Sequence, residues 1–175
     1  MSRSVQFRSM VVVAAIASLA VPAAAQADAT FEVSAENMKS MPLTAWGFKV
    51  ARTGTTNVGG GAGSSLKFDD VWFTKLVDEN SPKLFKLTAL GTHALNASIT
   101  VTKAGKQTMK YCFRDVLFTS IDDSGAGAAT PTETVKFNSA TVTLSYTPYS
   151  TLGYALSPIK FGWNAAASLT GDYTC

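Results

Sequence analysis

Residues 95–121 read LNASITVTKAGKQTMKYCFRDVLFTSI, with an apolar side chain at every second position between Leu95 and Val101. Asn, Ser and Thr occupy the alternate positions, which is the pattern of a strand with one buried face. Ala104 and Gly105 then suit a tight hairpin turn. Aromatic and β-branched residues return over Gln107–Ile121 and indicate a second, longer strand. The stretch therefore predicts an antiparallel hairpin, Leu95–Lys103 with Gln107–Ile121.

Other segments of the chain show similar β patterns. We expect strands at Thr30–Ala35, Leu43–Arg52, Ser65–Val77, Thr132–Thr147 and Ile159–Asn164. Within Thr132–Thr147 the apolar positions shift by one residue between Phe137 and Ala140. A bulge near Asn138–Ser139 would return both sets to the same face of the sheet.

One segment is predicted to be helical. Ser81 and Pro82 suit the N-cap and the first helical position, and Gly91 suits the end. Between them, Leu84, Leu87 and either Ala89 or Leu90 give one apolar side. The sequence thus predicts a mainly β fold, a closed or nearly closed antiparallel barrel or a sandwich, flanked by one short helix at about residues 81–90.

The N-terminal segment is typical of a secretory signal peptide. Arg3 and Arg8 precede an apolar run from Met10 to Val21, and small residues around Ala27 form a cleavage pattern. The run is short for a membrane anchor, which takes about 20 apolar residues. We expect a signal peptide at 1–27, one domain at 28–175 without stable membrane insertion, and a periplasmic or extracellular location.

The charge balance argues against a nucleic-acid partner. The chain has 15 Lys and Arg against 12 Asp and Glu, and loss of the signal peptide would remove two of the arginines. The remaining basic residues are scattered singly, whereas nucleic-acid binding requires a clustered basic surface.

Two cysteines, Cys112 and Cys175, lie in the expected mature region. Export to an oxidising compartment favours a disulfide between them, which would close a loop of 62 residues and stabilise the fold by up to about 4 kcal/mol. The alternatives are a buried free Cys112 with a disordered Cys175, or an intermolecular bridge.

Residues 57–65, NVGGGAGSS, resemble a phosphate-binding loop at first sight. However, Ser64 stands where such loops carry lysine or a third glycine, and a strand, not a helix, is expected to follow. We therefore predict an inter-strand loop that contacts a partner or a stacked copy, without a cofactor. Its residues are Asn57, Val58, Gly59, Gly60, Gly61, Ala62, Gly63 and Ser64.

The candidates for catalysis are weak. His93 is the single histidine, so a multi-histidine metal site is excluded, and the Gly-x-Ser-x-Gly motif is absent. Adjacent strand residues such as Asp69 and Asp70 point to opposite faces and cannot act together as a glycosidase pair. The pairs at 78–79 and 122–123 are expected in turns, and the three tryptophans in the core. We predict that the protein is not an enzyme.

The order of several short motifs resembles the Hcp family, the haemolysin-coregulated proteins of type VI secretion. These motifs are AWGF (45–48), the glycine loop, LKFDDVWFTK (66–75), SPKL (81–84), GTH (91–93), VTLSY (142–146) and IKFGWN (159–164). The resemblance covers about residues 30–164. It implies a β-barrel with one flanking helix, hexameric rings that stack into a tube, and contacts with the spike, the sheath and small effectors, without cofactors.

Three features depart from the family pattern. Tube subunits carry no signal peptide, the connection at Ser40–Pro42 is short for the family, and the tail 165–175 ends in a cysteine. We therefore expect an exported Hcp-like variant. The alternative is a monomeric exported barrel that binds a protein or glycan without a role in a tube.

Overall fold

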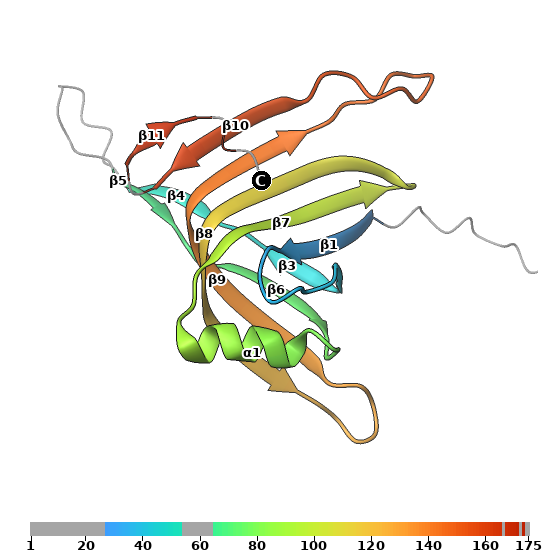
Figure 1. The fold of residues 1–175 in the computed structure, drawn as a ribbon. Helices are drawn as coiled ribbons and strands as arrows, with labels where there is room; N and C mark the ends of the chain where they lie inside the picture. The colour runs from blue at the N-terminus through green and yellow to red at the C-terminus, as the bar shows by residue number, and fades with distance from the viewer. Residues whose placement is uncertain (1–26, 54–64, 166, 172, 174–175) are drawn as a thin grey trace, which may run out of the picture.

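The computed structural model describes residues 27–53, 65–165, 167–171 and 173. Its elements are β1 (Ala27–Val33), β2 (Met41–Leu43), β3 (Ala45–Gly47), β4 (Val50–Thr53), β5 (Ser65–Phe68), β6 (Val71–Leu76), α1 (Ser81–Leu90), β7 (Ala94–Lys103), β8 (Lys106–Ser124), β9 (Thr132–Tyr146), β10 (Ile159–Asn164) and β11 (Leu169–Thr170). The expected mainly β, antiparallel fold with a short helix is confirmed (Figure 1).

The strand pairings form an almost closed circuit. β9 pairs with β8, β8 with β7, β7 with β1 and β1 with β2. Thr44 alone separates β2 from β3, and its backbone N–H donates to the carbonyl oxygen of Thr74 at 2.8 Å. β3 then pairs with β6, and β6 pairs with β9. The pairings therefore come close to a closed circuit, in which the step from β2 to β6 is made by the short link at Thr44 and not by a strand ladder.

The hairpin of residues 94–124 is present as β7 and β8. Ala104 and Gly105 both have positive φ, 51° and 73°, as a two-residue hairpin turn requires. β8 and β9 are long and curved, and run through both halves of the molecule (Figure 1). Asp115 lies within β8 with φ 54°.

The bulge expected near Asn138–Ser139 is wrong in position. Pairing with β8 keeps its register there, and the register shift lies instead between Phe118 and Ser120 of β8. The predicted change of phase along β9 is nevertheless real, because Phe137 is buried in the core and Val142 also packs against it. The face that points to the core switches by one residue in β8 as well, between Phe113 and Val116. Because the two paired strands switch at the same level, β9 needs no extra residue.

Two expected strands are interrupted. Leu43–Arg52 is divided among β2, β3 and β4, and Ser65–Val77 is divided into β5 and β6. In both, the chain leaves the barrel and forms a separate hairpin, in which β4 pairs with β5. The two breaks lie side by side, since the Asp69 N–H donates to the Lys49 carbonyl at 3.1 Å and the two side chains form an ion pair at 3.1 Å.

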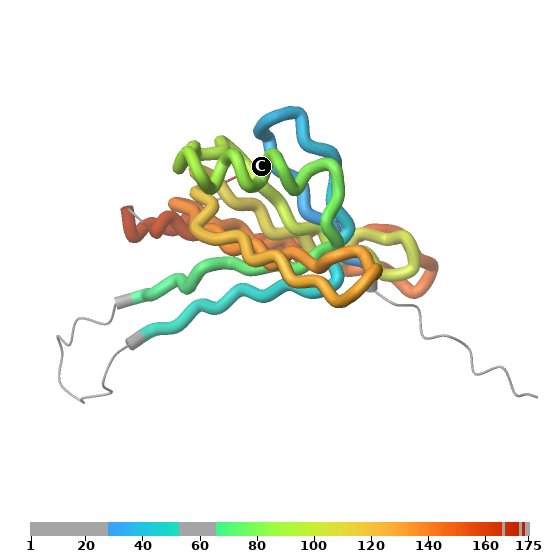
Figure 2. Tube along the Cα trace, turned by 90° about the horizontal axis from the view of Figure 1, so that it is seen from below, coloured from blue at the N-terminus to red at the C-terminus, as the bar shows by residue number. Residues whose placement is uncertain are grey.

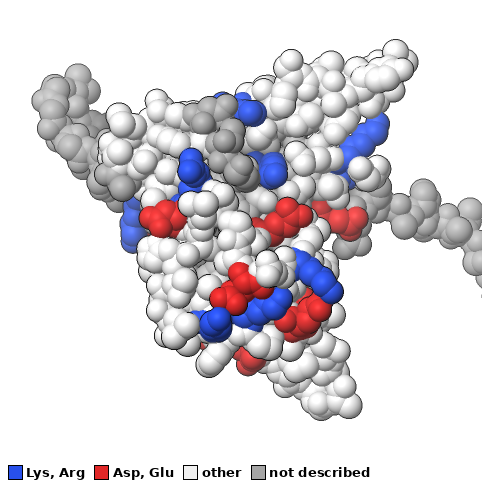
Figure 3. Space-filling model, viewed as in Figure 1, with Lys and Arg blue, Asp and Glu red and all other residues white. Residues whose placement is uncertain are grey.

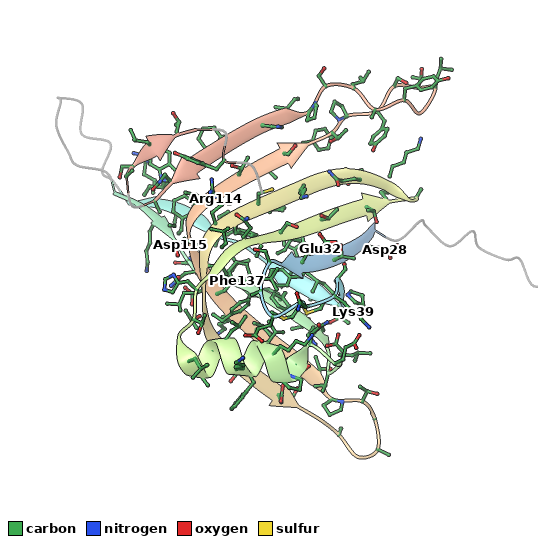
Figure 4. The ribbon with its side chains drawn as sticks, viewed as in Figure 1. Asp28, Glu32, Lys39, Arg114, Asp115 and Phe137 are labelled. Atoms are coloured by element: carbon green, nitrogen blue, oxygen red, sulfur yellow. The ribbon has the colours of Figure 1, made fainter. Side chains whose placement is uncertain are left out.

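Aromatic rings fill the core. Phe137 lies among the core side chains (Figure 4), and its ring is 5.1 Å from that of Phe113 and 5.5 Å from that of Phe31. The buried apolar residues form one cluster: Phe31, Val33, Met41, Val71, Phe73, Leu84, Leu87, Ala94, Ala97, Ile99, Phe113, Val116, Phe118, Val135 and Phe137. Leu95, expected on this face, is instead exposed.

The helix α1 has the predicted bounds and packs on one side of the sheet, away from the β4–β5 hairpin (Figure 2). Gly91 ends it in the left-handed conformation, with its N–H directed at the carbonyls of Leu87 and Thr88. Leu84 and Leu87 are buried, but Ala89 and Leu90 are exposed.

The predicted N-cap is wrong, because Asn80 and not Ser81 holds that position. The Ser81 hydroxyl has another role: it donates to the Glu133 carboxylate at 2.8 Å. The Nζ of Lys75 lies 2.9 Å from Glu133, 2.9 Å from Asp78 and 3.0 Å from Ser81. Lys75 and Glu133 are directly opposite in β6 and β9, and both are almost fully buried. This network joins the start of the helix to the barrel.

Candidate assembly surfaces

The predicted partner loop, Asn57 to Ser64, lies outside the described residues, but the hairpin that carries it is described. β4 and β5 project from the body of the molecule (Figures 1 and 2). Phe48 and Phe68 stack at the base of the hairpin with ring centroids 6.0 Å apart. Asp69 lies between Lys49 and Lys67, and the hydrogen bond from Lys49 lowers the pKa of Asp69 below its ordinary value.

A groove whose larger part is lined by apolar side chains separates this hairpin from the sheet. Its larger part has a volume of about 430 Å³ and its smaller part about 240 Å³. Phe48, Leu66, Phe68, Val142 and Trp163 line both parts. Burial raises the pKa of the Tyr111 phenol on the wall of the larger part, as expected on an apolar surface.

The connection between β9 and β10 forms an arm with an apolar surface. We define the arm surface as Tyr146, Leu152, Tyr154, Leu156 and Ile159, whose side chains are 47–82% exposed. The arm is ordered by a β-bridge between Tyr149 and Ala155 and by a hydrogen bond from Lys106 Nζ to the carbonyl of Gly153 at 3.0 Å. Residues 146–159 contain no charged side chain, so the arm presents an uncharged apolar patch to solvent.

The C-terminal segment turns back over the sheet. The Gly171 N–H donates to the carbonyl of Gly162 at 3.1 Å, and the Tyr173 N–H donates to Thr143 Oγ1 at 3.2 Å. Thr143 is directly opposite Cys112 in the β8–β9 register, so their side chains share a face. Cys112 is therefore on the face that the tail crosses, while Cys175 lies outside the described residues.

The catalytic candidates occupy structural or exposed positions. His93 Nδ1 lies 2.6 Å from Asp115, but the two side chains are 53% and 61% exposed, whereas a charge-relay site works in a water-excluded pocket. Asp70 accepts a hydrogen bond from Thr119 at 2.6 Å. Asp122 and Asp123, expected in a turn, lie instead in β8. In the described ranges, no group of three or more acidic, histidine or cysteine side chains is placed to hold a metal ion.

The prediction that all three tryptophans lie in the core is wrong. Trp46 packs partly against the core, 5.1 Å from the Tyr111 ring. Trp163 lines the groove. Trp72 is 39% exposed and lies over Gly47, where a Cβ would meet the indole. Because neighbouring Phe73 points into the core, Trp72 points out of it, so the three rings do not form one row.

Charged side chains of both signs gather around α1 and the β1–β2 connection (Figure 3). Lys39 pairs with Glu79 at 2.7 Å, and Lys86 pairs with Glu36 at 2.9 Å. This face is therefore mixed in sign and does not form the basic stripe of a nucleic-acid surface. No helix in the described part of the chain has the length and hydropathy to cross a membrane.

Comparison with known families decides the assignment. The family described as "Type VI secretion system effector, Hcp" matches residues 32–146. The chain belongs to the Hcp family. The match begins in β1 and ends with β9, so it includes the barrel, the helix and the partner loop. The resemblance inferred from the motif order is confirmed.

Hcp relatives agree with this assignment in sequence and in fold. The chain is 32% identical over 105 residues to protein hcp1 of Pseudomonas aeruginosa, an alignment that spans 57% of this chain and 65% of that relative, just under two thirds. A type six secretion system protein has the same fold, with a TM-score of 0.73 and 20% identity over 82% of this chain and 99% of its own. Hcp1 from Salmonella typhimurium has a TM-score of 0.67 and 23% identity over 82% and 98%.

Proposed function

We propose that this Hcp-family chain is a non-enzymatic structural protein of the type VI tube or effector-carrier kind, in which residues 28–175 act as one domain that associates with copies of itself. The family match over residues 32–146 is the observation that carries the proposal. Its hexameric ring, its export by a signal peptide and its partners among spike or effector proteins are parts of the same proposal.

The arm surface supports self-association. It exposes three aliphatic and two tyrosine side chains without a charge among them, and contiguous exposed apolar patches mark interaction sites on soluble proteins. The arm lies at one end of the sheet (Figure 1). A contact between this surface and a different surface of the next copy is heterologous, and such contacts close into rings when the rotation between copies allows.

The mass of the purified assembly tests this proposal. We expect light scattering to give a ring, and we expect Ile159→Lys to reduce the mass because it places a charge in the arm surface. Phe85→Lys is the matched control, since Phe85 is similarly exposed, at 66% against 69% for Ile159, but lies on α1. A wild-type monomer at high concentration would favour the monomeric exported binding module instead.

We also propose that Cys112 and Cys175 form a disulfide in an oxidising compartment. The Tyr173 N–H is hydrogen-bonded to Thr143, which lies directly opposite Cys112 on the same face. Cys175 follows Tyr173 by two residues, a length of chain that is enough to reach Cys112. The described residues contain no free cysteine, in agreement with the bridge. Titration of the denatured, unreduced protein is expected to find no thiol; two thiols per chain would contradict the bridge.

The third part of the proposal concerns the loop from Asn57 to Ser64. Because it follows β4 and precedes β5, it belongs to the hairpin that projects from the barrel. We propose that it contacts the next ring or a partner protein. Deleting residues 59–63, which shortens the connection between β4 and β5, is expected to leave the single ring intact but to remove higher stacks in electron micrographs; unchanged stacks would contradict this role.

A further inference from the structure

The groove between the β4–β5 hairpin and the sheet has the properties of a small-molecule site. The volume of its larger part, about 430 Å³, falls within the range of about 300–1,000 Å³ typical of ligand pockets. One wall comes from the hairpin and the other from β8, β9 and β10. Nine of its ten lining residues are apolar or aromatic.

The tenth lining residue, Arg52, is charged and exposed. Arg52 lies on β4 in a hairpin register with Leu66, so backbone pairing fixes the point from which its side chain extends. A guanidinium has five N–H donors. Arg52 already has a partner, and a guanidinium can contact more than one acceptor at a time, so a carboxylate can join that contact.

These observations together define the chemistry of the occupant. An uncharged apolar ligand would fill the walls without interacting with the Arg52 cation, and a polar anion would leave the aromatic walls in contact with water. We propose that the groove binds an apolar carboxylate, such as a medium-chain fatty acid, with the chain against Phe48, Leu144 and Phe161 and the carboxylate at Arg52.

The walls themselves favour a flexible chain. Leu144 and Phe161 are directly opposite in β9 and β10, so they form a continuous apolar surface across two strands. Val50 faces them from the hairpin and is 47% exposed. Burial of these partly exposed side chains on ligand binding removes apolar surface from water, which favours an apolar ligand.

Titration calorimetry with decanoate and with decanol tests the proposal, since the two ligands differ in the charged group. Decanoate is expected to saturate at one per chain and to bind at least about tenfold more tightly than decanol. Arg52→Gln is expected to remove this difference while leaving decanol binding unchanged. Lys110→Gln is the control: Lys110 is a cation on the same sheet, but it neighbours Tyr111 and so points away from the groove. It should have no effect.

Val50→Lys provides the second variant, because it places a charge in the groove from a partly exposed position. It is expected to abolish the binding of both ligands while leaving the circular dichroism spectrum unchanged. Equal affinity of the wild type for decanoate and decanol, or an unchanged preference in Arg52→Gln, would overturn the role of Arg52. Absence of saturable binding would overturn the site. If light scattering on the same sample then shows that Val50→Lys lowers the mass, a second copy of the chain occupies the groove instead.

Discussion

Lys75 is the residue whose replacement tests the description of the core most directly. Its ammonium group is buried and lies within 3.1 Å of the Glu133 and Asp78 carboxylates, the Ser81 hydroxyl and the Leu76 carbonyl. Lys75→Met retains a long, flexible side chain of similar shape. It leaves the carboxylate of Glu133, itself only 1% exposed, without its cation.

The magnitude follows from this burial. Removing one partner of a buried ion pair costs about 3–5 kcal/mol, because the remaining charge is left uncompensated away from water. Domains of ordinary stability unfold with about 5–15 kcal/mol, so the variant is expected to lose a large share of its stability. For a domain of this size, in which each kcal/mol shifts Tm by about 2–4 °C, the corresponding fall in Tm is about 6–20 °C.

Urea denaturation followed by circular dichroism measures this effect. The double variant Lys75→Met/Glu133→Leu removes both charges and is expected to recover most of the loss. Lys39→Met, which breaks an exposed ion pair with Glu79, should have no measurable effect. A loss below about 1 kcal/mol in Lys75→Met, or a double variant as unstable as the sum of the singles, would refute the reasoning.

Three further predictions rest on other features. Burial tends to raise the pKa of Asp78, but hydrogen bonds from Lys75 and Asn80 outweigh it and lower the pKa below the ordinary value. The ionised Asp78 therefore stabilises the fold above about pH 4, and this contribution is lost as the pH falls. In Asp78→Asn the decrease in Tm between pH 7 and pH 3 should be smaller than in the wild type. An equal decrease in both proteins would contradict this. In Gly162→Ala the new Cβ would overlap the carbonyl oxygen of Gly171, so the tail should be displaced and carboxypeptidase digestion faster than in the wild type; equal rates would show that the tail is not held there. Gly91→Ala places a side chain at φ 61° and should cost about 1 kcal/mol in urea denaturation, whereas no loss would argue against the left-handed helix end.

Local periodicity predicted those elements whose environment is uniform along their length. β10 and α1 have the expected bounds, and β10 pairs with the one strand β9 along its whole length. The turn at Ala104 and Gly105 was also predictable, since a glycine between two β-patterned segments is typical of a tight hairpin turn. Fold and family were therefore within reach of the sequence.

Elements that change partners were not predictable in this way. Leu43–Arg52 pairs with β1, β6 and β5 in turn. The alternation of apolar and polar residues predicts a strand, but it does not show where one partner strand replaces another. The Lys75–Glu133 pair was missed for the same reason: the residues are 58 positions apart, and only the register of β6 on β9 brings them together. The groove was missed because its aromatic residues read as ordinary core.

The return of the tail over the sheet affects how the protein can be extended. Because Tyr173 is held above Thr143 of β9, any sequence fused beyond the tail would emerge from the middle of a sheet face and not from an edge of the molecule. A purification tag or reporter placed there would occupy the space over β8 and β9. A fusion placed just after the expected cleavage site at Ala27 would leave from the start of β1 and would be retained when the signal peptide is removed, so it is the better choice for labelling.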